Sequence, residues 1–304
     1  MRLGLQISWF SWPGAPASIA PTLGRIARDA EDAGLASLWV MDHFWQIEMI
    51  GAPEREMLES YTTLAYVAAL TERIELGTLV TGVAHRHPGV LAKTVTTLDV
   101  LSGGRAWLGI GAGWYEAEAR GLGLPFGPVA ERFERLDEAL RVCRAMFDGD
   151  EQPIRGRFHT LERPLNSPPP LRRPPILVGG MGRDKTFRLV VRHADACNLF
   201  DVGPNGVAAS LAVLRQRCEE VGRDPAGIER TVLSRVTLSE RGGETAASGE
   251  TTVSVAEAVD RLGALAEVGV DTVVLGMAND SDPAAYPLVA DLVRQVDGLA
   301  PAPW

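Results

Sequence analysis

The sequence lacks the features of several protein classes. Its three cysteines, Cys143, Cys197 and Cys218, are widely spaced and include no CxxC pair, so they indicate reduced structural thiols rather than a disulfide framework. No long basic run is present, and 39 acidic residues against 30 basic ones give a formal net charge of -9, which argues against binding a phosphate backbone. No apolar run reaches the length of a membrane span, and the apolar start of the chain is too short for a signal peptide. We therefore expect a cytoplasmic protein with no membrane and no nucleic-acid partner.

Short apolar runs alternate with helical stripes along the whole chain. With 304 residues and 46% hydrophobic content, the chain can bury a large core. Eight strand and helix alternations without a break in composition predict one domain over residues 1–304, a closed (β/α)8 TIM barrel rather than a doubly wound sheet. The expected strands lie at about 3–7, 38–41, 74–80, 106–110, 176–178, 197–200, 231–238 and 272–275. Two segments interrupt the pattern: the proline-rich residues 149–175, an insertion with room for a small hairpin, and the polar residues 240–252, expected as a mobile loop.

Glycines follow two of the expected strands. One run, Gly111-Ala112-Gly113, ends a strand, helix, strand unit whose helix begins at His87-Pro88, and a second run, Gly179-Gly180, follows the fifth strand. The carboxyl ends of parallel strands are where such folds bind ligands. A single pair of glycines is usually only a turn, but two on neighbouring strands favour backbone that approaches a ligand closely.

His43 is the candidate for acid–base chemistry, because it comes directly after the second expected strand and an imidazole exchanges protons near neutral pH. The alternative is a buried histidine satisfied by hydrogen bonds. His85 and His87 have no evident third ligand, so no metal site is expected. Glu116 and Glu118 are acids close to the glycine run at Gly111 to Gly113, but a role as carboxylates that favour the start of a helix explains them as well.

Several motifs together resemble the luciferase-like monooxygenase superfamily, and within it the oxidoreductases that use the deazaflavin coenzyme F420. The resemblance covers almost the whole chain in order and is weakest in the two interrupting segments. Its motifs are Asp42-His43-Phe44, the strand Leu76 to Val80, Arg86-His87-Pro88, the loop Gly109 to Trp114, and Glu131-Arg132-Phe133.

The resemblance implies a bacterial-luciferase-like barrel and a role for each matching residue. His43 matches the active-site histidine, Asp42 and Gly82 stand where the family contacts the deazaflavin ring, and Leu79-Val80 falls where related enzymes place a non-prolyl cis peptide behind that ring. The positions that would hold the ring and the phosphate-bearing tail are Ala112, Gly113, Gly179, Gly180 and Met181. A homodimer is also a family expectation.

Two departures separate the chain from the sugar-phosphate dehydrogenases of that branch. Trp114 stands where those enzymes have a catalytic glutamate, and Phe200 and Gly203 align with their phosphate-binding threonine and lysine. Trp9, Trp45 and Trp114 are expected either to form a dry wall or to pack in the core. The resemblance therefore implies an F420-dependent oxidoreductase, and we expect it to transfer hydride to or from a small, largely apolar organic substrate. The alternatives are an FMN-dependent monooxygenase and a non-catalytic cofactor-binding protein on the same fold.

Overall fold

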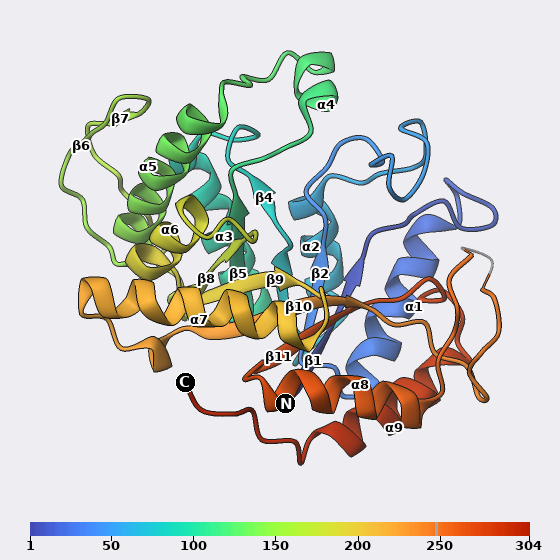
Figure 1. Cartoon of the computed structure of the whole chain (residues 1–304). Coiled ribbons are helices and arrows are strands. Elements are labelled where there is room, and N and C mark those ends of the chain that lie inside the picture. Colours follow the sequence, from blue (N-terminus) through green and yellow to red (C-terminus); the bar gives the residue numbers. More distant parts are fainter. Residues whose placement is uncertain (247–248) are drawn as a thin grey trace.

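The computed structural model describes residues 1–246 and 249–304. In this part of the chain, eight parallel strands form a closed barrel, in which β3 and β4 are two pieces of one strand (Figure 1). The strands are β1 (Arg2–Ile7), β2 (Ser37–Val40), β3 (Glu75–Thr78), β4 (Thr81–Gly82), β5 (Ala106–Gly111), β8 (Ile176–Gly179), β9 (Ala196–Phe200), β10 (Glu229–Arg235) and β11 (Thr272–Gly276). The predicted (β/α)8 barrel is confirmed.

The barrel closes where β3 pairs with β5. Leu76 pairs with Ala106 and Gly77 with Trp107, while β1 pairs with β2 on one side and with β11 on the other. Because every barrel pair is parallel, each strand must be followed by a crossover, and helices provide it.

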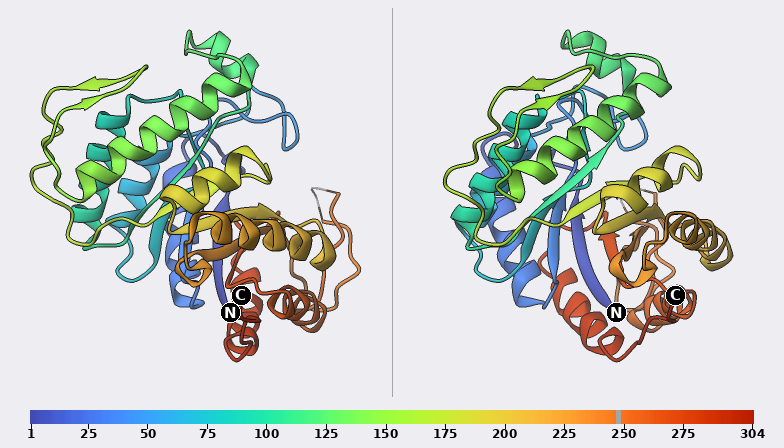
Figure 2. Two further views of the ribbon diagram at one scale, coloured as in Figure 1. Left: turned by 60° about the vertical axis from the view of Figure 1, so that its left-hand side comes forward. Right: turned by 90° about the vertical axis from the view of Figure 1, so that its left-hand side faces the viewer.

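The helices form the outer layer, as the two rotated views in Figure 2 show. They are α1 (Ile19–Asp32), α2 (Ser60–Ala68), α3 (Pro88–Ser102), α4 (Glu116–Gly121), α5 (Val129–Phe147), α6 (Lys185–His193), α7 (Pro204–Val221), α8 (Val255–Glu267) and α9 (Ala285–Val296). The larger apolar core unites strand and helix side chains, and a smaller one includes Trp39 and Trp107, whose rings meet edge to face at 5.8 Å. Burying each large apolar side chain stabilises the fold by about 1.5–3 kcal/mol, which explains why both faces of the strands are apolar. None of the helices in the described ranges is long and apolar enough to cross a membrane.

Helix α3 begins and ends where the sequence predicts. The side chain of His87 accepts a hydrogen bond from the backbone N–H of Gly89, and Pro88 occupies the first turn. Gly103, at φ 73°, ends the helix in the left-handed conformation that glycine adopts without steric cost.

The strand predicted over residues 74–80 is interrupted, because the Leu79–Val80 peptide is cis, as the resemblance implied. Hydrogen bonds hold the backbone in place between β3 and β4. Gln6 Nε2 donates to the Leu79 carbonyl at 2.9 Å, and the hydroxyls of Thr78 and Thr81 lie 2.8 Å apart. The side chain of Val80 then occupies the space beside Gly111 and Gly179, where an added Cβ would come within 2.9 Å of it.

Other boundaries differ modestly from the prediction. The segment 149–175 does contain a small antiparallel hairpin, β6 (Ile154–Arg155) with β7 (Thr160–Leu161). Strand β10 ends at Arg235 rather than at residue 238, and α7 begins at Pro204 rather than at residue 207, since proline suits a first helical turn. Helix α4 begins at Glu116, where the two acids indicated a helix start, although its end was not predicted, and neither was the short 3-10 turn η1 (Pro225–Gly227).

The polar segment 240–252 is only partly described. A bridge joins Leu238 to Val253, and another joins Thr245 to Thr251. Residues 247–248 of the expected mobile loop lie outside the described residues.

Candidate active site

The glycine runs of three neighbouring strands meet at the carboxyl end of the barrel. Gly82 on β4 pairs with Gly111 on β5, and Ile110 on β5 pairs with Val178 on β8. The predicted ligand positions that follow these strands, Ala112, Gly113, Gly180 and Met181, are partly exposed. The structure therefore brings the predicted rim together at one end of the barrel.

Two rim glycines have conformations that favour glycine. Gly113 has φ 73° and Gly180 has φ 123°, a region that other residues rarely adopt. A Cβ built on Gly113 would meet no atom within 4 Å, so backbone here faces open space. A flat or phosphate-bearing ligand can therefore approach the backbone at Gly113, whereas the N–H of Gly180 already donates to the Asn198 carbonyl at 3.1 Å. On the observation at Gly113, the rim fits the deazaflavin that the resemblance implies.

Asp42 is placed beneath the rim rather than on it. It is 2% exposed, and its carboxylate accepts hydrogen bonds from Ser60 Oγ at 2.6 Å and from both terminal nitrogens of Arg86 at 2.7 and 3.0 Å. Burial alone would raise the pKa of Asp42, but hydrogen bonds from His85 and Arg86 outweigh burial and lower it. The carboxylate is thus committed to protein partners, and direct contact between Asp42 and a cofactor stays a prediction.

His43 lies at the barrel mouth, with 15% of its side chain exposed. Its Nδ1 is 3.0 Å from Oε2 of Glu118, and its ring meets Trp114 and Tyr115 edge to face at 5.6 and 5.9 Å. No hydrogen-bond partner for Nε2 is found among residues 1–246 and 249–304. His43 can therefore hold one proton toward Glu118 and exchange another at Nε2.

Glu118 is the site residue that sequence reasoning missed. It is 1% exposed and also accepts hydrogen bonds from the backbone amides of Phe44 at 2.6 Å and Trp45 at 2.9 Å. Burial would raise the pKa of Glu118, but the hydrogen bonds from His43, Trp45 and Phe44 lower it. Both acids do lie in the first turn of α4, as the explanation of them as helix-start acids requires. Only Glu116 is exposed and pairs with Arg120 on the same helix, whereas Glu118 is buried against His43.

His85 connects Glu118 to Asp42. Its Nδ1 is 3.1 Å from Asp42 Oδ2, and its Nε2 is 3.7 Å from Glu118 Oε2. Arg86 continues the network by pairing with Glu59 as well as with Asp42. The result is a row of alternating imidazole and carboxylate groups behind His43, which the sequence alone did not indicate.

Aromatic rings form one side of the mouth. Trp114 is 53% exposed and stacks on Tyr115, with centroids 5.1 Å apart and an interplanar angle of 18°. Trp9 and Trp45 are partly buried, and the ring of Trp45 packs on Gly121. Of the three tryptophans considered for an apolar wall, Trp114 lies directly beside His43.

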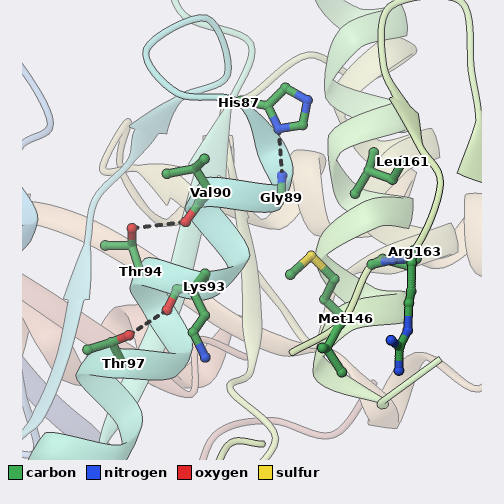
Figure 3. A pocket seen from close by; sticks show the side chains of 11 residues that line it. His87, Gly89, Val90, Lys93, Thr94, Thr97, Met146, Leu161 and Arg163 are labelled. Carbon is green, nitrogen blue, oxygen red and sulfur yellow. Dashed lines mark hydrogen bonds between the residues drawn. The ribbon is translucent and has the colours of Figure 1, made fainter. Parts of the chain in front are cut away.

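A surface hollow is present among the described residues, but a metal centre is not. In the described residues, no group of three or more His, Cys, Asp or Glu side chains could hold a metal ion. A hollow of about 420 Å³ lies between α3, Met146 of α5 and residues 161–165, and none of the predicted ligand positions lines it (Figure 3). It is lined by His87, Lys93 and Arg163 among others, on the outside of the barrel.

Comparison with known proteins finds some that are named for the cofactor F420 and a protein that is in complex with FMN. The family model of luciferase-like monooxygenase matches residues 1–254. The F420-dependent glucose-6-phosphate dehydrogenase of Kineococcus radiotolerans is 31% identical over 229 residues, which cover 72% of this chain but only 64% of that protein. This chain thus spans less than two thirds of that relative.

Solved structures match over nearly the full chain. An F420-dependent secondary alcohol dehydrogenase in complex with an F420-acetone adduct superposes with a TM-score of 0.81 at 18% identity, covering 97% of this chain and 98% of that one. The oxygenating constituent of 3,6-diketocamphane monooxygenase from Pseudomonas putida, in complex with FMN, gives a TM-score of 0.77 at 18% identity and covers 100% of both chains. At such identities these matches establish the fold alone.

Proposed function

The chain belongs to the luciferase-like monooxygenase family of enzymes, and on this premise we propose that it is an F420-dependent oxidoreductase acting on a small, largely apolar organic substrate. The observation that carries the proposal is His43, held by Glu118 at Nδ1 and open at Nε2, beside a glycine rim. The F420-dependent relative at 31% identity supports the choice of cofactor.

When bound, the deazaflavin supplies or accepts a hydride. We assign its binding to the backbone of Gly82, Ala112, Gly113, Gly179, Gly180 and Met181, with Leu79–Val80 behind the ring. The rim fits this role because Gly113 faces open space. The part of this chain in the chemistry is to exclude water, to orient the substrate and to exchange one proton through His43.

The surroundings of His43 favour a neutral substrate. The indole of Trp114 is exposed. Burial raises the pKa of the neighbouring Tyr115, and the carboxylates of Glu48, Glu118 and Glu54 raise it further. Carboxylates on this side of the mouth repel a phosphate or carboxylate substrate. We therefore propose secondary alcohols, or the ketones derived from them, with an apolar or aromatic side rather than a sugar phosphate.

Titration with each cofactor tests the proposal. The purified protein should bind F420, followed by its fluorescence, and should reduce it when a neutral secondary alcohol is added, or oxidise its reduced form with the ketone. Turnover with glucose 6-phosphate but not with neutral alcohols or ketones would contradict the substrate class.

An FMN-dependent monooxygenase is the second candidate, favoured by the FMN-bound structural neighbour. Binding of reduced FMN with substrate-dependent oxygen consumption, and no binding of F420, would establish it instead. Tight F420 binding without turnover across a broad panel would indicate a non-catalytic cofactor-binding protein.

We also propose a homodimer. Large apolar side chains are exposed on α3 and in the segment before β8, namely Val90, Leu101, Leu165 and Leu171. Val90 and Leu165 line one surface hollow, and exposed apolar surface that gathers in this way favours association. Sedimentation equilibrium would give the oligomeric state, and a monomer at micromolar concentration would contradict the proposal.

A further inference from the structure

His43 is held from behind by a buried carboxylate. Oε2 of Glu118 lies 3.0 Å from His43 Nδ1, while Oε1 accepts hydrogen bonds from the backbone amides of Phe44 and Trp45. An ionised carboxylate only accepts hydrogen bonds, so the proton in the contact with His43 belongs to Nδ1. Both oxygens of Glu118 are therefore used to fix the loop after β2.

The helix that carries Glu118 is attached to the same loop a second time. Gly121, at the end of α4, packs on the ring of Trp45 so closely that a Cβ there would overlap the indole. Figure 1 shows α4 at the end of an excursion beyond the main ring of helices. The two contacts hold this excursion against the residues that follow β2, so Glu118 and His43 keep their relative positions.

His85 is a second imidazole close to Glu118. Its Nε2 lies 3.7 Å from the same Oε2 that faces His43, and its Nδ1 lies 3.1 Å from Asp42. Asp42 is in turn fixed by both terminal nitrogens of Arg86. Charged and polar groups thus surround Glu118 and stabilise its ionised form, the form that accepts from Nδ1.

We propose that Glu118 is a positioning residue for proton transfer by His43: it keeps one proton on Nδ1 and leaves the Nε2 lone pair to face the substrate oxygen. This role rests on the proposed F420-dependent reaction. In alcohol oxidation, the C–H bond would break and its electron pair would leave as a hydride that a bound deazaflavin would accept. The O–H proton passes to His43 Nε2, and the carbonyl double bond forms; ketone reduction is the reverse. A histidine protonated only at Nε2 has no lone pair there and cannot take this proton.

Nitrogen NMR tests the tautomer without any cofactor or turnover. The sequence has five histidines, so the His43 resonances of protein labelled with 15N-histidine are assigned as those missing from His43→Asn. At pH 8.5 we expect His43 to carry its proton on Nδ1, with Nε2 unprotonated. A His43 protonated only at Nε2 in the unmodified protein would overturn the proposal, whatever the cofactor proves to be.

Glu118→Gln tests whether residue 118 sets the tautomer of His43, because it reverses the direction of the hydrogen bond between the two side chains. The amide oxygen can still accept from Phe44 and Trp45, but the amide N–H would donate to His43 Nδ1 and move the imidazole proton to Nε2. Glu116→Gln is the matched control, because Glu116 lies on the same helix, is exposed and pairs only with Arg120 among the described residues.

With F420 and a substrate that the unmodified protein turns over, Glu118→Gln should lower kcat about 100-fold or more, since acid–base catalysis contributes 10²–10⁴-fold. KM and the cofactor Kd should change less than about threefold, and Glu116→Gln should match the unmodified protein in every measurement. The proposal would be overturned if Glu118→Gln had the kcat of the unmodified protein, or if the His43 nitrogen shifts were the same in both proteins. Absence of turnover in the unmodified protein would instead count against the proposed function and leave the NMR result standing.

Discussion

Asp280 should make the protein less stable as the pH rises. It lies in the loop after β11, is 4% exposed, and its backbone carbonyl accepts a hydrogen bond from the Tyr286 hydroxyl at 2.7 Å. Burial raises the pKa of Asp280 from 3.8 to about 7, against weaker opposing effects of Trp12, Ser281 and Arg25. The indole Nε1 of Trp12 lies near this carboxyl without completing a hydrogen bond, so the charged form is poorly compensated.

The direction in which the free energy of unfolding changes with pH follows from the protons that Asp280 binds in each state. Below about pH 4, Asp280 is protonated in both the folded and the unfolded chain and has no effect. Between pH 4 and 7 the folded state keeps a proton that the unfolded state releases, so the free energy of unfolding falls as the pH rises. The difference between 3.8 and about 7 corresponds to a loss of about 4 kcal/mol in all, and about 2.5 kcal/mol of it falls between pH 5 and 8.

Comparison with Asp280→Asn isolates this contribution, because the amide resembles the neutral acid and does not titrate. Urea denaturation at pH 5 and pH 8 should show Asp280→Asn gaining about 2.5 kcal/mol relative to the unmodified protein between the two pH values. The control is Asp260→Asn, which changes an exposed carboxylate on α8 and should shift stability equally at both. A difference between the Asp280→Asn and unmodified proteins that stays constant within about 0.5 kcal/mol from pH 5 to 8 would refute the reasoning.

Three further substitutions, one of them with a matched control, test the site and the barrel. His43→Ala should keep F420 affinity within about tenfold and slow hydride transfer in single-turnover experiments, and unchanged turnover would remove His43 from the mechanism. Gly109→Ala should destabilise the fold by about 3 kcal/mol or more, since a Cβ there would overlap a carbonyl oxygen of β3. Gly263→Ala on α8, where a Cβ meets no atom within 4 Å, is its matched control and should be neutral or stabilising in the same denaturation assay. Asp42→Asn should cost about 3–5 kcal/mol because it removes the buried one of the two carboxylates that pair with the partly buried Arg86, and an unchanged urea midpoint would contradict the pairing.

The barrel could be predicted because its signals are local and repeated. Most strands are short and rich in apolar residues, and the long helices repeat apolar residues at a spacing of three or four. The boundaries of α3 followed from His87 and Gly103, since capping depends on neighbours in the sequence. The place of the glycine rim followed as well, because parallel strands bring their carboxyl ends to one edge.

The network behind His43 could not be predicted in this way, because its members come from different loops. Glu118 and Glu116 are both acids near the start of one short helix, and no local pattern distinguishes the one that is 1% exposed from the one that is exposed. The distinction arises only when α4 packs on the loop after β2 and directs one carboxylate to His43 and the other to solvent. Acid–base geometry at this mouth is therefore a tertiary property: the strand places the imidazole, and a segment 75 residues later determines which of its nitrogens carries the proton.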